Sequence, residues 1–302
     1  MPVPPPDGRI IRFVDIQADR VRLRTAVHGS GRPLLLITGL GASLDLGAPF
    51  ERELAAQGVQ TVSFDAPGTG QSTPYAWPRR MPGLARTVER LLDALGYQQV
   101  DVLGASLGGV IAQQLAHQAP HRVRRLVLAA TGPGLGGIPG SPRALLAFAT
   151  PRRYHQPGHY QRIAARTYGG AARRDPDSPR LTLAAEPAAG PSLRGYLGQI
   201  YAISGWTSLP WLRTLRQQTL VLAGDDDPIV PVANGRILAR CIPHARLHIV
   251  RRGGHLFLLD SAAEMAGLVA AFLSGDDRRS HPAALCRPAR MTRGRQRGTL
   301  RR

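Results

Sequence analysis

The sequence of 302 residues contains no lysine, so all 39 of its basic residues are arginine. With 20 acidic residues, the formal net charge is +19. A charge of this sign and size favours anionic partners such as nucleic acid, phospholipid or an acidic protein. A genome biased toward arginine, together with an unselected tail, would explain the composition equally well, because lysine is missing even from ordinary helix surfaces. Charge alone therefore assigns no partner.

Cysteine and long hydrophobic runs are also scarce. The two cysteines, Cys241 and Cys286, lie far apart in the sequence, and neither has the setting of a catalytic thiol. No apolar run approaches the roughly 20 residues that a membrane-spanning helix needs. The opening residues, MPVPPPDGR, are rich in proline and contain an aspartate where a secretion signal would be apolar. We therefore expect a reduced, cytoplasmic protein with no transmembrane segment.

Apolar segments alternate with helical patterns along most of the chain. Segments 9–16 and 20–28 alternate apolar and polar residues, as the half-buried strands of an antiparallel hairpin do. Short continuous apolar runs, typical of a parallel sheet covered on both faces, predict strands at 33–39, 59–65, 99–106, 122–131, 218–225 and 245–252. Helices are expected at about 48–57, 82–95, 107–118, 233–241 and 261–273. The pattern predicts an α/β fold: a mostly parallel, doubly wound sheet with an N-terminal antiparallel hairpin.

Residues 132–213 interrupt this alternation, since they contain no apolar strand and are too many for a simple loop. Five of the seven tyrosines and two of the three tryptophans lie here, namely Tyr154, Tyr160, Tyr168, Tyr196, Tyr201, Trp206 and Trp211. We expect a helical cap over the active site, whose aromatic side chains either line an acyl pocket or form the core of the cap. The domain division is then an α/β core at 1–131 and 214–274, with the cap at 132–213.

A tail at 275–302 has no periodicity and is highly polar, so we expect it to be disordered. It contains nine arginines and two aspartates, a net charge of +7. The tail is therefore a candidate for binding an anionic surface.

The strongest local motif is Gly104-Ala105-Ser106-Leu107-Gly108, between a predicted strand and a predicted helix. A nucleophilic serine must project from a sharp strand-to-helix turn whose crowded backbone leaves no room for side chains at the two glycines. The N–H groups of the following helix then face the oxyanion that develops during ester cleavage. The pentapeptide alone recurs by chance, but in this setting it predicts Ser106 as a nucleophile.

A serine nucleophile needs a histidine base and an acid, in the chain order serine, acid, histidine for this kind of turn. Of the nine histidines, only His255 follows the last predicted strand in a glycine-rich loop. The acid cannot follow the strand at 122–131, because residues 102–174 contain no Asp or Glu. The acid must therefore be one of the consecutive aspartates Asp225–Asp227, and chemistry alone does not show which one. The two aspartates that are not the acid would form the turn or lie exposed beside it.

Two backbone N–H groups are expected to form the oxyanion hole. One belongs to Leu107, directly after the serine, and the other to Leu40, in the loop that follows the first central strand. Gly39 and Gly41 permit a turn that points the Leu40 N–H inward. Two such donors contribute about 3–4 kcal/mol each to stabilising a transition state.

Together these segments resemble the α/β-hydrolase superfamily over residues 9–274. In members with a Gly-x-x-Asp-Pro-x-x-Pro segment the acid is the third residue after the glycine, which implies Asp227 here, with Pro228 and Pro231 matching. Further segments resemble the intracellular, medium-chain-length poly(3-hydroxyalkanoate) depolymerases: Pro151–Pro157, Tyr168–Ala171, Arg173–Pro176, Gly205–Ser208, Leu220–Pro228 and Gly254–Leu258. Two departures concern the acyl pocket and oxyanion loop, since Leu107 stands where the family often has tryptophan, and Thr38-Gly39 replaces Asn-Gly.

This resemblance implies hydrolysis of a storage polyester at the surface of cytoplasmic granules, through an acyl-enzyme and without a metal or organic cofactor. An esterase, lactonase or thioesterase for small molecules, or a haloperoxidase-like perhydrolase, would use the same three residues. A different class also remains, a polybasic surface-binding protein whose hydrolase core is incidental. The sequence leaves the oligomeric state open.

Overall fold

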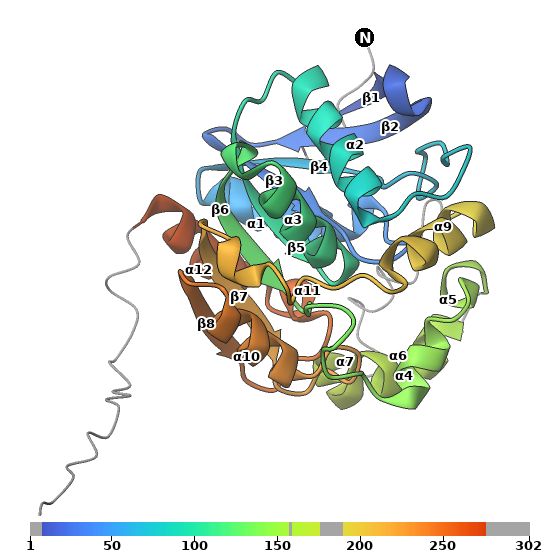
Figure 1. Ribbon diagram of the computed structural model, residues 1–302. Helices are drawn as coiled ribbons and strands as arrows, with labels where there is room; N and C mark the ends of the chain where they lie inside the picture. The colour runs from blue at the N-terminus through green and yellow to red at the C-terminus, as the bar shows by residue number, and fades with distance from the viewer. Residues whose placement is uncertain (1–7, 157–158, 176–189, 276–302) are drawn as a thin grey trace, which may run out of the picture.

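The computed structural model describes residues 8–156, 159–175 and 190–275 (Figure 1). The arginine-rich tail, with its expected disorder and Cys286, lies outside the described residues apart from Gly275. None of the helices in the described ranges combines the length and hydropathy that a membrane span requires.

Within these ranges one sheet of eight strands has the order β1-β2-β4-β3-β5-β6-β7-β8. The strands are β1 (Ile10–Ile16), β2 (Val21–His28), β3 (Arg32–Ile37), β4 (Val59–Phe64), β5 (Val100–Ala105), β6 (Val123–Ala129), β7 (Gln218–Gly224) and β8 (Ala245–Val250). The pairs β1–β2 and β2–β4 are antiparallel, and the other neighbouring pairs are parallel. The predicted α/β fold is confirmed, and every strand begins within one residue of its expected start.

Helices cover both faces of this sheet (Figure 1). One face packs against α2 (Met81–Ala94), α3 (Leu107–Gln118) and α10 (Val232–Cys241), and the other against α1 (Ala48–Ala56), α11 (Phe257–Asp260) and α12 (Ala262–Ser274). In β3 the side chains of Leu35 and Ile37 enter the first core while those of Leu34 and Leu36 enter the second. Burial on both faces explains why the central strands are continuous apolar runs.

Between β6 and β7 the described residues form helices α4 (Pro142–Ala147), α5 (Arg152–His155), α6 (His159–Tyr168), α7 (Gly170–Arg174) and α9 (Leu193–Ile203). In Figure 1 these helices lie together beyond the carboxyl ends of the central strands. The expected lack of an apolar strand holds for the described part of this interval, where the one β interaction is an isolated bridge between Gly134 and Thr207.

The strand order places a crevice where β3 and β5 end. From β3 the chain continues to β4 on one side, and it later returns to β5 on the other side. Loops that leave adjacent parallel strands in opposite directions open a crevice at the carboxyl end of the sheet, where α/β proteins bind ligands. The loop after β3 carries Leu40, and the turn after β5 carries Ser106. The two sequence-predicted oxyanion segments therefore meet at this crevice.

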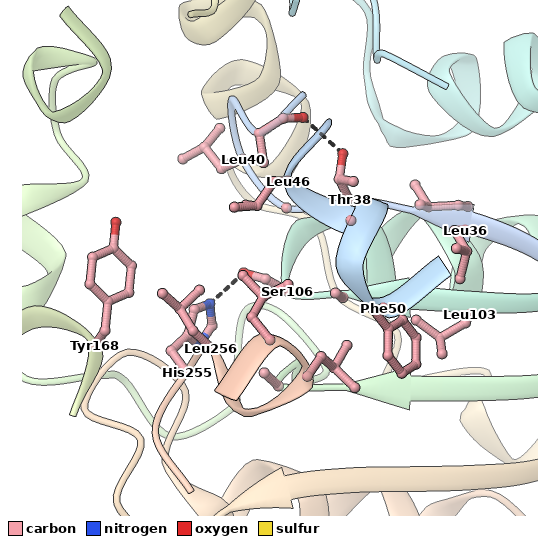
Figure 2. Close-up of a pocket in the computed structure, with 18 of the residues that line it drawn as sticks. Leu36, Thr38, Leu40, Leu46, Phe50, Leu103, Ser106, Tyr168, His255 and Leu256 are labelled. Carbon is pink, nitrogen blue, oxygen red and sulfur yellow. Dashed lines mark hydrogen bonds between the residues drawn. The ribbon is translucent and has the colours of Figure 1, made fainter. Parts of the chain in front are cut away.

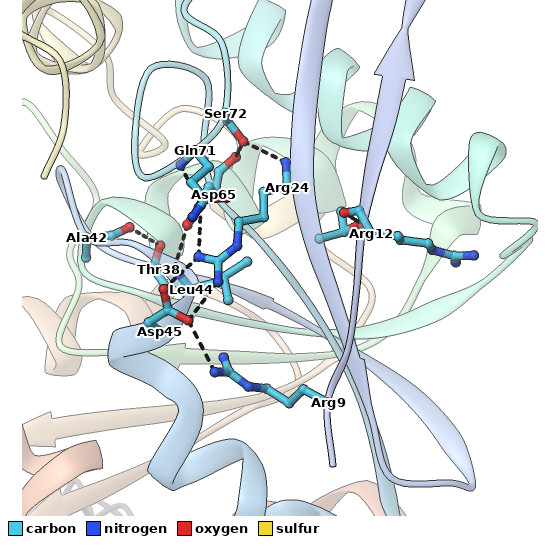
Figure 3. A network of polar contacts seen from close by, with 11 residues as sticks. Arg9, Arg12, Arg24, Thr38, Ala42, Leu44, Asp45, Asp65, Gln71 and Ser72 are labelled. Atoms are coloured by element: carbon cyan, nitrogen blue, oxygen red, sulfur yellow. Dashed lines mark hydrogen bonds and ion pairs between the residues drawn. The ribbon is translucent and has the colours of Figure 1, made fainter. Parts of the chain in front are cut away.

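A buried polar network holds the segment after β3 against the loop after β4 and against β2 (Figure 3). Asp65 directly follows β4, and its fully buried carboxylate accepts hydrogen bonds from the N–H groups of Leu44 (2.7 Å) and Gln71 (3.1 Å). Arg24 of β2 lies 3.6 Å from the Asp65 carboxylate and 2.6 Å from that of Asp45. Burial raises the pKa of Asp65, and its two backbone hydrogen bonds and Arg24 oppose that rise. The network ties the segment after β3, the loop after β4 and the N-terminal hairpin together.

We expect Asp65→Ala to lower the free energy of unfolding by about 2–4 kcal/mol, because the buried N–H of Leu44, the partly buried N–H of Gln71 and the Arg24 guanidinium lose an acceptor. Urea unfolding of the variant measures this loss. The control is Asp15→Ala, which removes an exposed carboxylate 3.9 Å from Arg22 and should cost less than about 0.5 kcal/mol. Equal losses in the two variants would contradict a special role for the network.

Candidate active site

Ser106 lies at the sharp turn between β5 and α3, with φ 55° and ψ −119°. A positive φ is uncommon for a residue with a side chain, and it is the conformation that an exposed nucleophile on a strand-to-helix turn requires. A Cβ atom on Gly104 would overlap the carbonyl oxygen of Gly108, and one on Gly108 would overlap the carbonyl oxygen of Ile37. The spacing of glycines predicted from the sequence thus has a steric cause.

Three side chains that the sequence singles out are joined by hydrogen bonds, of which Figure 2 shows the one between Ser106 and His255. His255 Nε2 lies 3.0 Å from Ser106 Oγ, and His255 Nδ1 lies 2.8 Å from Asp227 Oδ2. Asp227 and His255 are 6% and 9% exposed, so water is largely excluded from their contact. This is the arrangement in which an imidazole can accept the serine proton while a carboxylate holds its other nitrogen protonated.

The turn after β7 holds the Asp227 carboxylate in place. Its Oδ1 atom accepts hydrogen bonds from the backbone N–H groups of Ile229 (2.8 Å) and Val230 (2.9 Å), which leaves Oδ2 directed at His255. Each oxygen of the buried carboxylate therefore has a donor, as a buried charge requires.

The two neighbouring aspartates differ from one another. Asp225 is exposed, as expected for a companion residue. Asp226 is more than a turn former, because its Oδ2 accepts a hydrogen bond from the Gly170 N–H (2.7 Å) and its Oδ1 lies 3.1 Å from Arg173 Nη1. Its own N–H donates to the carbonyl oxygen of Gly253 (2.9 Å). Asp226 thus links the acid turn to α7 and to the loop that carries His255.

The histidine loop contacts the same inserted helices. The backbone N–H of His255 donates to the carbonyl oxygen of Tyr168, at the end of α6 (2.7 Å). Gly169 and Gly170 allow this approach, because a Cβ atom on Gly170 would overlap the Gly254 nitrogen and one on Gly169 would overlap the Asp226 carbonyl oxygen. The helices between β6 and β7 therefore fix the backbones of the acid and histidine loops.

The loop after β3 makes a tight turn beside Ser106. The Ala42 N–H donates to the Gly39 carbonyl oxygen (3.1 Å), and Gly41 has φ +69°. A positive φ at the third residue but not at the second, Leu40, indicates a type II turn, for which glycine is the favoured third residue. Leu40 and Leu107, the two predicted oxyanion donors, line the same cleft as Ser106.

Two residues that hold this turn were missed by sequence reasoning. Gln199 of α9 accepts a hydrogen bond from the Gly41 N–H (2.9 Å), and the Tyr154 hydroxyl donates to the Leu40 carbonyl oxygen (2.7 Å). Gln199 also donates to Thr69 Oγ1 (2.8 Å). These contacts join segments more than 110 residues apart, and nothing in the local sequence signals them.

A cavity of about 130 Å³ opens beside Ser106 and His255 (Figure 2). Its walls are mainly apolar and include Leu36, Leu46, Phe50, Leu103, Leu256 and Leu258. Tyr154 and Tyr168 line it, whereas Tyr196 is fully buried and Trp206 and Trp211 pack against the main core. Tyr154 and Tyr168 thus take the expected pocket-lining role, whereas Trp206 and Trp211 pack against the core of the sheet and not against a core of the cap. Tyr201 is 42% exposed, and the side chain of Tyr160 lies outside the described set.

A second, larger cleft of about 680 Å³ also reaches Ser106. It runs between the loop after β6 and helices α4 and α9, and it shares Leu40, Ser106 and Phe148 with the smaller cavity. Ser106 therefore lies where a small apolar cavity and a wide cleft meet. In the described part of the chain no group of His, Cys, Asp and Glu is placed to hold a metal ion.

The α/β hydrolase fold family model matches residues 32–262. The chain belongs to this family.

A poly(3-hydroxyalkanoate) depolymerase from Ectopseudomonas oleovorans is 45% identical over 275 residues, which are 89% of this chain and 96% of that relative. A 2-hydroxymuconate semialdehyde hydrolase from Pseudomonas sp. strain CF600 is 31% identical over 281 residues, 84% of this chain and 92% of the relative. The crystal structure of a hydrolase from Pseudomonas aeruginosa PA01 is 26% identical and has a TM-score of 0.73, covering 87% of this chain and 98% of that chain. The resemblance inferred from the motifs is confirmed.

We expect Asp226→Ala to lower kcat of this hydrolase about three- to tenfold with little change in KM, because the turn carrying Asp227 loses its link to α7. Steady-state kinetics with a soluble ester, and the rate of covalent labelling by a fluorophosphonate, measure the effect. Asp225→Ala is the matched control, since this exposed neighbour should leave both rates within about twofold. If both variants behave alike, Asp226 does not position the acid.

Proposed function

We propose that the chain is a serine hydrolase that cleaves the ester bonds of a poly(3-hydroxyalkanoate) through an acyl-enzyme on Ser106. The hydrogen-bonded series Ser106–His255–Asp227 carries the proposal of ester hydrolysis. The polyester is supported by the depolymerase relative, 45% identical over 89% of this chain. The activity would take place in the cytoplasm, at the surface of storage granules.

In the first step Ser106 Oγ attacks the ester carbonyl carbon while His255 Nε2 accepts the serine proton. Asp227 stabilises the imidazolium through its hydrogen bond to Nδ1. The carbonyl oxygen becomes an oxyanion, for which we propose the N–H groups of Leu40 and Leu107 as donors. The tetrahedral intermediate then collapses, and His255 gives its proton to the leaving alcohol.

In the second step water attacks the acyl-enzyme with His255 again acting as the base. A second oxyanion forms at the same donors and collapses, and His255 returns its proton to Ser106 Oγ as the 3-hydroxy acid leaves. Every step uses side chains and backbone groups of this chain together with water.

The two hollows beside Ser106 support different roles for the two sides of the scissile bond. The small apolar cavity suits the aliphatic side chain on the acyl half, whose burial is favourable by about 0.8 kcal/mol per CH₂ group. The wide cleft suits the leaving alcohol, which in a polymer is the rest of the chain. We further propose residues 132–213 as a cap inserted into a core of residues 1–131 and 214–274, because this interval contributes residues to both hollows.

The nucleophile is tested with Ser106→Ala, which should fold normally, lose at least about 1,000-fold in turnover and no longer react with a fluorophosphonate. Ser204→Ala removes an exposed hydroxyl that bonds within α9 and should remain fully active. Retention of activity by the Ser106 variant would refute the assignment. Brisk turnover of short soluble esters by the unaltered enzyme, without release of 3-hydroxy acids from granules, would favour a small-molecule esterase.

The acyl cavity is tested with Leu46→Phe, which adds volume to its wall. We expect kcat/KM for a p-nitrophenyl octanoate to fall about tenfold or more relative to the acetate, since filling space of one or two methylenes is worth about 1–3 kcal/mol. Leu46→Met keeps the volume and should preserve the ratio. An unchanged ratio in the phenylalanine variant would mean that the acyl chain binds elsewhere.

A further inference from the structure

Large apolar side chains are exposed mainly in one region of the described chain. Of the ten large apolar side chains that are exposed in the described chain, seven lie between β6 and β7: Leu135, Ile138, Leu145, Leu146, Leu193, Leu197 and Tyr201. Exposed apolar residues that are scattered singly need no explanation, but a concentration of them marks a surface that binds something.

Helix α9 shows that this exposure follows a pattern. Leu193, Leu197 and Tyr201 are spaced by four residues, so they form one stripe along the helix, and they are 61%, 50% and 42% exposed. The opposite side of α9 is buried through Gly195, Tyr196, Gln199 and Ala202. A surface helix normally turns charged or polar residues toward solvent, and this one presents an apolar stripe instead.

The exposed residues are continuous with the cleft that leads to Ser106. Leu135, Ile138 and Leu145 line this cleft, and so do Ile200 and Ile203, which lie on α9 next to the stripe. A hydrogen bond from the Tyr196 hydroxyl to the Phe148 carbonyl oxygen (2.7 Å) joins α9 to the chain just after α4. The apolar rim, defined as Leu135, Ile138, Leu145, Leu146, Leu193, Leu197 and Tyr201, therefore borders the entrance to the reactive serine.

We propose that this apolar rim docks the protein on the surface of solid polyester and so brings the polymer chain into the cleft. The inference rests on the proposed function, because a chain embedded in a solid reaches Ser106 only if the cleft entrance lies against that solid. The stripe itself contains no charged residue; the charges beside it are Arg194 of α9 and Arg80, whose guanidinium lies 4.1 Å from the centroid of the Tyr201 ring, so Leu193 and Leu197 form its uncharged part. An aliphatic, uncharged polyester matches such a surface better than an anionic membrane, whose binding depends mainly on clusters of basic residues.

The test compares Leu193→Ser/Leu197→Ser with the control Ile10→Ser/Phe13→Ser. The control residues are also exposed and apolar (66% and 41%) but lie on β1, the edge strand far from the cleft in the sheet order. Binding is measured by co-sedimentation with amorphous poly(3-hydroxyoctanoate) granules in the Ser106→Ala background, where hydrolysis does not alter the surface. Turnover of a short soluble ester is measured with Ser106 intact.

We expect the α9 variant to bind granules about tenfold or more weakly, since two leucines no longer leave water, and to keep its soluble-ester turnover within about twofold. The control should match the unaltered protein in both measurements, and rising salt should not weaken granule binding. Equal granule binding by the two variants, absence of any binding, or binding lost in high salt would overturn the proposal. A third outcome separates the two proposals: the α9 variant alone binds granules weakly, but the active enzyme releases no 3-hydroxy acid from them. This result would support the docking surface and refute the polyester as the substrate.

Discussion

The tight packing of backbone at the turn after β5 is the constraint on which the rest of the site depends. Gly108 lies directly against the Ile37 carbonyl oxygen, so the start of α3 touches the end of β3. On the other side, Thr131 Oγ1 donates to the Ser106 carbonyl oxygen (2.8 Å), which ties the turn to the chain after β6. Three adjacent strand ends are thereby locked around Ser106. Because the loop after β3 starts beside this turn, the two proposed oxyanion donors lie close together, and the contacts of Gln199 and Tyr154 then hold the turn at Leu40.

The histidine and the acid depend on a different part of the molecule. Their loops follow β7 and β8, and both are held by the segment from Tyr168 to Arg173 through the Tyr168 carbonyl, the Gly170 N–H and the Arg173 guanidinium. This segment belongs to the inserted helices that also line the two hollows. Any displacement of α6 and α7 would therefore change the alignment of His255 with Ser106 as well as the shape of the cavity. The same two helices therefore affect both the access of the substrate and the alignment of the reacting groups.

Local signals explain what could be predicted from the sequence. Continuous apolar strands, the glycines around Ser106 and the glycine-rich loop at His255 each depend on residues within a few positions of one another, and they located the sheet and the two side chains. Among Asp225–Asp227, by contrast, the local chemistry is the same, and only the family motif distinguished Asp227. The contacts of Asp226 with Gly170 and Arg173, and those of Gln199 and Tyr154 with the turn at Leu40, join segments from about 50 to 160 residues apart. Such pairings depend on the packing of the inserted helices, for which the sequence offers no periodic signal.

The placement of Ser106 between two hollows of unequal size also explains how one set of reacting groups can serve different esters. In the function proposed above only the acyl half of a substrate occupies the small cavity, so its leucine and phenylalanine walls would decide which side chain is accepted. In the same proposal the alcohol half leaves through a cleft whose entrance continues onto exposed leucines, which suits a long leaving chain. A related hydrolase with the same serine, histidine and acid could therefore change substrate by changing the inserted helices alone. The interval between β6 and β7 is where this chain differs most from a bare α/β sheet, and it is the part of the fold that selects the substrate in the function proposed above.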